Sequence, residues 1–166
     1  MSVFVTVGTT KFDALVSAVD DTRCRALLHR LGHDSMTVQI GHGRVVPRES
    51  SVGGATPAVR HFRHEPSLAP HIAAASLVIS HGGAGTIMEV LRARKPLVVV
   101  VNDALMGNHQ TELAEALQQR GHLVATSPDA LVETLERYDA GSIVPYGEAD
   151  AAKFALMVDE HMGFAA

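Results

Sequence analysis

The sequence contains little cysteine and few aromatic residues. Among its 166 residues there is one cysteine, Cys24, there is no tryptophan, and aromatic residues make up 4%. A lone cysteine cannot form a disulfide within the chain, which excludes a fold held together by internal disulfides. Because Cys24 lies in a stretch with helical periodicity, we expect a buried structural thiol, and the reducing cytosol is the compartment that suits it.

Long apolar runs and basic runs are absent as well. The longest apolar stretch, residues 96–101, is far shorter than the roughly 20 residues that a membrane-spanning helix needs. The beginning of the chain lacks the basic and apolar regions of a secretory signal peptide and predicts a strand instead. A net charge of −4, a pI near 6.2 and the lack of any Lys/Arg run argue against nucleic acid as a partner.

What the sequence does contain is an alternation of strand and helix patterns over one domain, residues 1–166. At 46% hydrophobic and 19% charged, the composition suits a single folded core. The predicted strands are residues 3–7, 36–40, 58–62, 77–79, 97–101 and 123–125. The predicted helices are two stretches between residues 12 and 31, then 67–75, a helix ending near 94, 108–119, one that Ser127 and Pro128 open as N-cap and first turn, and 149–162. Gly32 and Gly121 are expected to end two of these helices.

This alternation indicates an α/β fold. Strands that are apolar on both faces are typical of a mainly parallel sheet with helices on both faces, which makes the fold Rossmann-like. Such folds bind ligands beyond the carboxyl ends of the strands, near the point where the strand order reverses. Residues 41–57, rich in Gly, Ser and Pro, predict a long loop with a short strand at Val45 and Val46, and loops of that length often carry function.

The stretch from His81 to Glu89, HGGAGTIME, follows a predicted buried strand and opens a helix. Its small residues let a ligand approach the backbone N–H groups at the positive end of the helix, which suits a diphosphate. In the alternative interpretation the glycines form only a tight turn, with Thr86 and Glu89 as a capping box. Likewise, Thr9 and Thr10 after the first strand either donate to phosphate or cap the first helix. The spacing is not the G-x-G-x-x-G dinucleotide pattern.

Several ordered motifs together resemble a known family. HGGAGTxxE is followed by KPLVVV from residue 95 and by NHQxExA from residue 108. With these motifs, residues 3 to about 126 resemble the carboxyl-terminal half of glycosyltransferase family 28. The opening VTVGTTxFD (residues 5–13) and QIGxG (residues 39–43) are similar to the short eukaryotic branch of that family. This branch is the cytosolic catalytic subunit of the enzyme that adds the second N-acetylglucosamine to dolichol-pyrophosphate-linked N-acetylglucosamine.

The resemblance implies one half of a GT-B glycosyltransferase, the half that binds the nucleotide-sugar donor. In the family, the glycine motif and helix start hold the diphosphate, the loop after the first strand approaches the phosphates, the glutamate accepts hydrogen bonds from the ribose hydroxyls, and the His-Gln pair touches the sugar. The implied donor-binding residues are Gly8, Thr9, Thr10, Gly82, Gly83, Ala84, Gly85, Thr86, Glu89, Asn108, His109 and Gln110. Asn108 is in addition expected to be the N-cap of its helix.

The implied reaction is inverting transfer of N-acetylglucosamine from UDP-N-acetylglucosamine, forming a β1,4 linkage, as the second step of N-glycan precursor assembly. A GT-B enzyme has two Rossmann-like domains, so activity is expected only with a membrane-anchored, acceptor-binding partner that recruits this chain to the cytosolic face of the endoplasmic reticulum. The tail from about residue 138, with its predicted helix, packs either on this domain or on that partner. Two alternatives stay open: a bacterial capsule-type split transferase using another UDP-sugar, and a non-catalytic nucleotide-sugar-binding or interaction module.

No residue stands out as the general base that the reaction needs. His81 and Asp103 follow predicted strands and are candidates, each equally open to a structural role. Ten histidines suggest a metal, but His29 and His33, which are spaced to share a helix face, have no third ligand in a recognisable motif. We expect neither metal nor cofactor, because a helix N-terminus and hydrogen-bond donors can stabilise the departing diphosphate.

Overall fold

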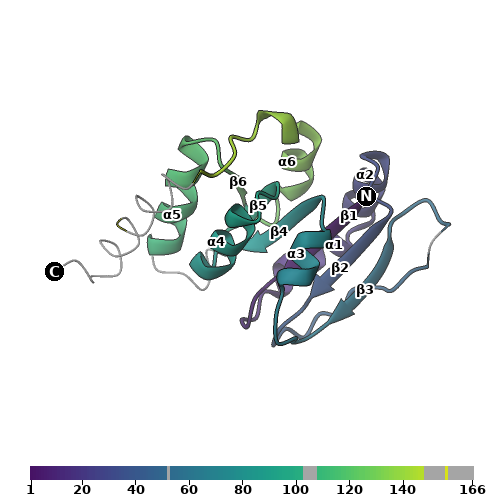
Figure 1. The fold of residues 1–166 in the computed structure, drawn as a ribbon. Coiled ribbons are helices and arrows are strands. Elements are labelled where there is room, and N and C mark those ends of the chain that lie inside the picture. Colours follow the sequence, from purple (N-terminus) through teal and green to yellow (C-terminus); the bar gives the residue numbers. More distant parts are fainter. Residues whose placement is uncertain (52, 103–107, 148–155, 157–166) are drawn as a thin grey trace.

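The polypeptide forms a parallel sheet between two layers of helices (Figure 1). The computed structural model describes residues 1–51, 53–102, 108–147 and 156. The strands in this part are β1 (Ser2–Thr6), β2 (Ser35–Gln39), β3 (Ala58–Phe62), β4 (Leu77–His81), β5 (Leu97–Val100) and β6 (Val124–Thr126). The helices are α1 (Asp13–Asp20), α2 (Thr22–Arg30), α3 (Ala69–Ala74), α4 (Ala84–Arg92), α5 (Asn108–Gln119) and α6 (Leu131–Arg137), followed by the short 3₁₀ helix η1 (Ala140–Ser142).

The sheet has the topology of a doubly wound fold. Its described strands lie in the order β3-β2-β1-β4-β5-β6, and all neighbours are parallel. The chain first adds strands on one side of β1 and then, from β4 onward, on the other side. The strand order therefore reverses between β1 and β4, which is where folds of this kind bind their ligands.

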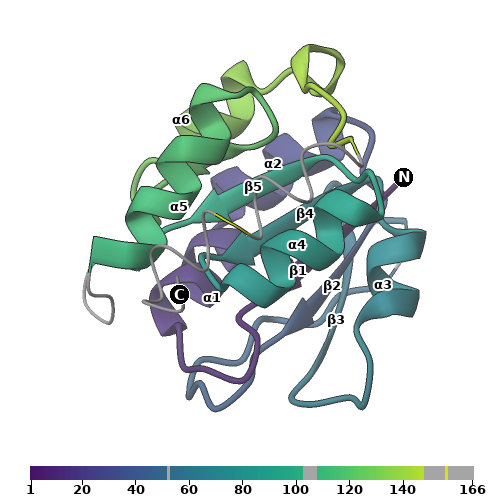
Figure 2. The same cartoon turned by 60° about the vertical axis from the view of Figure 1, so that its left-hand side comes forward.

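Helices cover both faces of the sheet. Helices α1, α2 and α6 pack on one face, and α3, α4 and α5 pack on the other (Figure 2). Along β1 the side chains alternate, because Val3 and Val5 pack with the first set of helices and Phe4 with the second. A strand buried in this way is normally apolar on both faces. The Rossmann-like α/β fold predicted from the sequence is confirmed.

Most predicted elements are confirmed to within two or three residues. Gly32 follows the end of α2 and Gly121 follows the end of α5, each with a φ in the left-handed region, +88° and +76°, so both predicted helix ends are confirmed. Cys24 lies buried in α2, and desolvation raises the pKa of its thiol to about 12. That environment confirms the structural thiol expected at this position.

Two local predictions are wrong. Val45 and Val46 form no strand, because the Asp13 carboxylate binds the Val45 backbone N–H that a strand would have to share. Helix α6 begins three residues later than its predicted first turn, with Ala130 as N-cap, since the Ser127 hydroxyl accepts the Ala130 N–H at 3.3 Å and closes a separate turn. The helix predicted at residues 149–162 lies outside the described residues.

Candidate functional site

The loops that leave β1 and β4 meet at the carboxyl edge of the sheet. The first, residues 7–12 and here called the β1 loop, leads into α1, and the second, the β4–α4 junction of residues 81–86, leads into α4. Strands β1 and β4 are paired, with Thr6 opposite Ser80. The two loops therefore start side by side at the reversal of strand order, where a ligand is expected.

His81 fills the space between these two loops. Its ring is almost fully buried, and a Cβ placed on Gly8 would lie 2.6 Å from the ring Cε1. A Cβ on Gly83 would collide with Nε2 of the same ring. Gly8 also has a φ of +63°, in the left-handed region that favours glycine. Glycine at these two positions is a packing requirement, and His81 acts as a structural wedge.

Burial also sets the protonation state of His81. Desolvation lowers the pKa of its ring from the ordinary value, and the nearby Thr6 backbone opposes this shift only in part. The ring is therefore neutral at pH 7, and within the described residues its Nδ1 has no well-formed hydrogen bond. A neutral imidazole can accept a proton, but the two glycine-bearing loops enclose this one. The packing favours the structural interpretation of His81, and its role as a general base stays a prediction.

The first turn of α4 presents free backbone donors. The first backbone hydrogen bond of the helix runs from Ile87 N–H to Gly83 O, at 3.0 Å, so the N–H groups of residues 84–86 have no partner within the helix. Gly83 is the N-cap and supplies no side-chain cap, and nothing lies within 4 Å of a Cβ placed on Gly85. This open backbone at the positive end of a helix suits an anion.

The capping-box interpretation of Thr86 and Glu89 is wrong. Gly83 occupies the N-cap and Thr86 is the third residue of α4, so its hydroxyl is not placed to cap the helix. Glu89 lies one turn beyond Gly85 on the same helix face, and both residues are exposed. Among the described residues the Glu89 carboxylate forms no hydrogen bond or ion pair. It is therefore available to accept hydrogen bonds from a ligand.

The threonines of the β1 loop do not cap α1, so that alternative is also wrong. Phe12 is the N-cap of α1, and no side chain makes a cap hydrogen bond there. The Thr10 hydroxyl donates instead to Val7 O at 2.8 Å, within the loop. Thr9 is exposed, and within the described part of the chain its amide and hydroxyl form no hydrogen bond. Of the two threonines, Thr9 has donors free for a phosphate.

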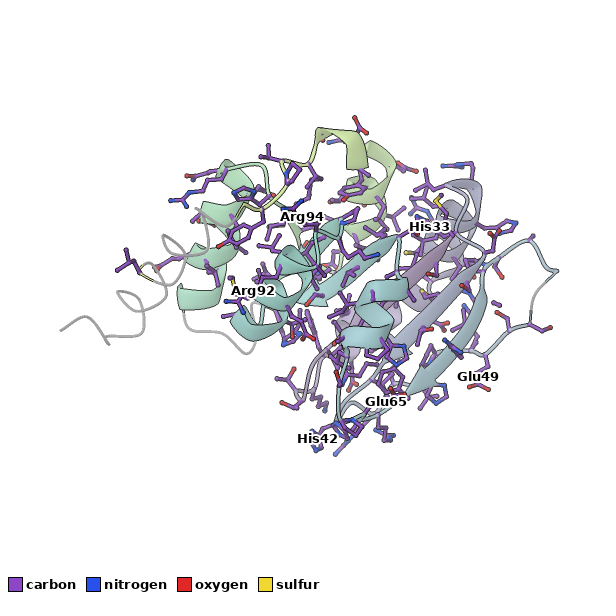
Figure 3. All side chains as sticks on the ribbon, viewed as in Figure 1. His33, His42, Glu49, Glu65, Arg92 and Arg94 are labelled. Atoms are coloured by element: carbon purple, nitrogen blue, oxygen red, sulfur yellow. The ribbon has the colours of Figure 1, made fainter. Side chains whose placement is uncertain are left out.

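A third loop packs against the β1 loop at the same edge. This β2–β3 segment, residues 40–50, follows β2. His42 N–H donates to Thr10 O at 3.1 Å, and the His42 Nδ1 lies 2.7 Å from Thr9 O. Figure 3 shows His42 at this edge of the molecule and His33 at the opposite edge. The segment supports the β1 loop from the side.

Charged side chains fix the backbone of the β2–β3 segment. Asp13 Oδ1 accepts the N–H groups of Arg44 and Val45, at 2.8 and 3.2 Å. From β3's carboxyl end, Arg63 Nη1 donates to the carbonyls of Gly41 and Gly43, at 3.1 and 2.9 Å. Sequence reasoning gave Asp13 and Arg63 no such role, because their partners lie 20 or more residues away and no motif links them.

Part of the predicted donor site lies beyond the described structure. Asn108, His109 and Gln110 form the first turn of α5, but their side chains lie outside the described part. Asp103 also lies outside the described residues. Because α5 follows β5, the parallel neighbour of β4, its first turn belongs to the same edge of the sheet. Sugar binding by these side chains stays a prediction.

At the described carboxyl edge of the sheet, backbone N–H groups and hydroxyls can bind an anion. Within the described residues no three His, Cys, Asp or Glu side chains are arranged to hold a metal ion. No helix in that part is long and apolar enough to cross a bilayer. The expectation that the chain uses no metal stays a prediction.

Comparison with known proteins connects these features to a family. The model of the glycosyltransferase family 28 C-terminal domain matches residues 2–161. The chain is 48% identical over 120 residues to UDP-N-acetylglucosamine transferase subunit ALG13 of Mus musculus. The matched stretch covers 72% of this chain and 10% of the mouse protein. It is 32% identical over 190 residues to the subunit of the same name from Eremothecium gossypii. That match covers 96% of this chain and 92% of the Eremothecium gossypii protein.

Solved structures have the same fold. The NMR solution structure of ALG13 is 25% identical, with a TM-score of 0.70 and 94% of each chain covered. MurG of Acinetobacter baumannii is 19% identical, with a TM-score of 0.61, covering 86% of this chain and 42% of that one. The chain spans only a tenth of the length of the mouse relative that it matches. With the family model matching nearly its full length, the chain belongs to the glycosyltransferase family 28 C-terminal domain family.

Proposed function

We propose that this chain is the donor-binding, catalytic subunit of an inverting N-acetylglucosaminyltransferase. It binds UDP-N-acetylglucosamine at the carboxyl edge of its sheet and transfers the sugar to dolichol-pyrophosphate-linked N-acetylglucosamine. The observation that carries the proposal is the open first turn of α4, which lies across the His81 ring from the β1 loop. Glu89, one turn along the same helix, completes a surface for a nucleoside diphosphate.

In this proposal each part of the edge binds one part of the donor. The free N–H groups of residues 84–86 and the positive end of α4 bind the diphosphate. Thr9 approaches the same phosphates from the β1 loop. Glu89 suits the ribose because an ionised carboxylate accepts strong hydrogen bonds from two neighbouring hydroxyls. His109 and Gln110, in the first turn of α5, contact the sugar.

The relatives' names support the choice of donor. The mouse and Eremothecium gossypii proteins are both named UDP-N-acetylglucosamine transferase subunit ALG13. Identity to the mouse protein is 48% over a stretch that covers 72% of this chain. We therefore favour UDP-N-acetylglucosamine over UDP-galactose and other UDP-sugars.

The word 'subunit' in the same names supports a requirement for a partner. Family members of the GT-B type bind donor and acceptor between two Rossmann-like domains, and this chain, which corresponds to 42% of MurG, supplies one such domain. We propose that a membrane-anchored subunit supplies the other domain and presents the lipid-linked acceptor. That subunit recruits the chain to the cytosolic face of the endoplasmic reticulum.

The contribution of this chain to the reaction is electrostatic. As the bond between the sugar and UDP breaks, negative charge develops on the diphosphate, and the donors at the start of α4 stabilise that charge. The acceptor hydroxyl must lose its proton to a general base. Asp103, His81 and a group of the partner are the candidates. The scheme uses neither a metal nor a cofactor.

Calorimetric titration of the purified chain with UDP-N-acetylglucosamine, UDP-galactose and UDP, with and without the co-expressed membrane partner, tests the proposal. We expect binding selective for UDP-N-acetylglucosamine, and transfer to the lipid-linked acceptor only when the partner is present. Selective binding of UDP-galactose would favour the capsule-type alternative. Donor binding without transfer in the presence of the partner would favour a non-catalytic module, and no donor binding in either preparation would overturn the proposal.

The substitution Glu89→Ala tests the ribose contact. We expect UDP binding to weaken about tenfold or more, because a hydrogen bond to a charged group contributes about 1.5–3 kcal/mol. The fold should persist, since Glu89 is exposed and alanine favours helix. Glu136→Ala, at an exposed position of α6, is the matched control and should bind UDP as the wild type does. Equal UDP affinities of the two folded variants would remove Glu89 from the ribose site.

A further inference from the structure

A row of buried polar side chains crosses the sheet directly beneath the two loops. Gln39, Thr6 and Ser80 occupy matched register positions near the carboxyl ends of β2, β1 and β4. Gln39 is 3% exposed, and Thr6 and Ser80 are 0% exposed. Parallel strands buried on both faces are normally apolar, and a buried polar group is costly unless a hydrogen bond satisfies it. The partners of this row therefore indicate why it is there.

The hydrogen bonds of the row lead from the β1 loop into the sheet. Gly8 N–H donates to Thr6 Oγ1 at 3.0 Å, and the Thr6 hydroxyl donates in turn to Gln39 Oε1. A backbone N–H can only donate and an amide oxygen can only accept, so the two neighbours together orient the Thr6 hydroxyl. Linked hydrogen bonds of this kind also polarise one another. On the other side, Ser80 Oγ donates to His81 O at 2.7 Å, where the β4–α4 junction begins.

The hydrogen bond from its N–H to Thr6 Oγ1 fixes Gly8, the residue on which the β1 loop turns. Gly8 combines a left-handed φ with close contact to the His81 ring, so a small rotation there would move the whole loop. Because Thr6 takes up the Gly8 N–H, that donor is not available to a ligand. The free donors that remain in the loop, within the described residues, include the amide and hydroxyl of Thr9.

We propose that Thr6 and Gln39 are positioning residues that hold the β1 loop in the conformation that receives the donor's phosphates. Both side chains are buried beneath the loop, so they act through Gly8 and not by touching the ligand. The inference rests on the proposed function, because it concerns the same phosphate site. It assigns part of the affinity for UDP to a polar pair inside the sheet.

The variants Thr6→Val and Thr6→Ser separate positioning from packing. Valine keeps the shape of threonine but has no oxygen for Gly8 N–H, whereas serine keeps the hydroxyl and loses a buried methyl group. In calorimetric titration of the full chain, with its partner if the wild type needs it, we expect Thr6→Val to weaken UDP binding about tenfold. Thr6→Ser should stay within about twofold of the wild type, even though the lost methyl group lowers its melting temperature. Affinities that instead follow the melting temperatures would overturn the inference.

Gln39→Leu tests the second member of the pair. Without the amide oxygen the Thr6 hydroxyl loses its acceptor and can rotate, so we expect UDP binding to weaken about three- to fivefold. Thr37→Val is the matched control, because Thr37 lies two residues earlier on the same face of β2 and its hydroxyl accepts from Arg60 Nε at 2.9 Å, away from the loop. The inference fails if Gln39→Leu and Thr37→Val have the same UDP affinity.

Hydrogen exchange at the Gly8 amide distinguishes failure of this inference from failure of the proposed function. We expect Gly8 to be protected in the wild type and in Thr6→Ser, and to exchange at least about tenfold faster in Thr6→Val. If the wild type binds UDP and Thr6→Val binds it equally well despite fast exchange at Gly8, only the inference is overturned. If the wild type binds no UDP with or without its partner, the proposed function fails, and the inference fails with it whatever Gly8 shows.

Discussion

The β2–β3 segment and the β4–α4 junction both contain glycines at the carboxyl edge, yet they treat their backbone polar groups in opposite ways. In the segment, Arg63 binds two carbonyl groups and Asp13 binds two N–H groups. In the junction, the N–H groups of residues 84–86 have no partner within the helix, and no side chain caps it. Backbone that is already satisfied serves as scaffold, whereas open backbone at a helix start is a surface for an anion.

The largest expected effect on the unfolding free energy comes from removing the hydrogen bonds of Arg25. This buried side chain binds Asp20 Oδ1 at 3.3 Å, Arg48 O at 3.1 Å and Ser50 Oγ at 2.6 Å, and so ties the far end of the β2–β3 segment to α2. Arg25→Met leaves the mostly buried Asp20 carboxylate without this partner, which should cost about 3 kcal/mol of unfolding free energy. Urea unfolding measures the loss, and UDP affinity of the folded variant should stay within about twofold of wild type.

The control for that experiment is Arg23→Met, two residues earlier on α2. Arg23 is exposed and lies 3.9 Å from Glu133, so its loss should change the unfolding free energy by less than about 0.5 kcal/mol. An Arg25→Met protein that keeps its stability and loses UDP affinity would show that the segment is part of the binding surface. The division between scaffold and site would then be wrong.

At the junction, Gly83→Ala is expected to lower both stability and binding. Its Cβ would collide with the His81 ring, which in turn packs against Gly8, so the two loops must move apart. Overpacking of this kind costs about 1–3 kcal/mol. Urea unfolding and UDP titration of the same preparation measure the two effects. A variant of wild-type stability would show that the ring can move aside and does not hold the loops together.

Sequence patterns predicted the central strands of the sheet because these strands are buried on both faces. The apolar run at residues 97–101 predicted β5 in nearly the right place. The strand predicted at residues 58–62 coincides with β3. The register of these strands and the reversal between β1 and β4 followed only from the structure. Local hydrogen bonds explain the misses, since Asp13 takes the Val45 N–H and Ser127 takes the Ala130 N–H.

The glycine-rich loops of the candidate site were also predictable, but the groups that hold them were not. Gly83 and Gly85 looked equivalent in the motif, and only the His81 ring distinguishes a glycine needed for packing from one beside open space. The ties through Arg25 and Arg63 join residues about 20 apart, and no periodicity encodes them. A usable signal did exist for Thr6 and Gln39, because each is a polar residue within a run of apolar strand positions.

Acid is expected to weaken the junction through His81. Burial holds the pKa of this ring below the value of 6.5 that an unfolded chain has, so between the two values the unfolded state binds more protons. Stability therefore rises with pH in that range and falls as the pH drops from about 7.5 to 5.5. Urea unfolding at both pH values should show a smaller fall in unfolding free energy for His81→Phe, which keeps an aromatic ring between the two loops. His33, whose pKa burial also lowers, contributes to the remaining fall in the unfolding free energy.

Gly85→Ala has the smallest expected effect on stability, and this effect should be a gain. A Cβ at Gly85 meets no atom within 4 Å, so replacing glycine by alanine in this helix should raise the unfolding free energy by about 0.5–1 kcal/mol. The same methyl group would cover the open N–H groups of the first turn and weaken UDP binding several-fold. Thermal unfolding and calorimetry of one preparation measure both changes. If Gly85→Ala gains stability and binds UDP as tightly as the wild type, the phosphates do not approach this turn, and the open backbone of α4 is not the binding surface.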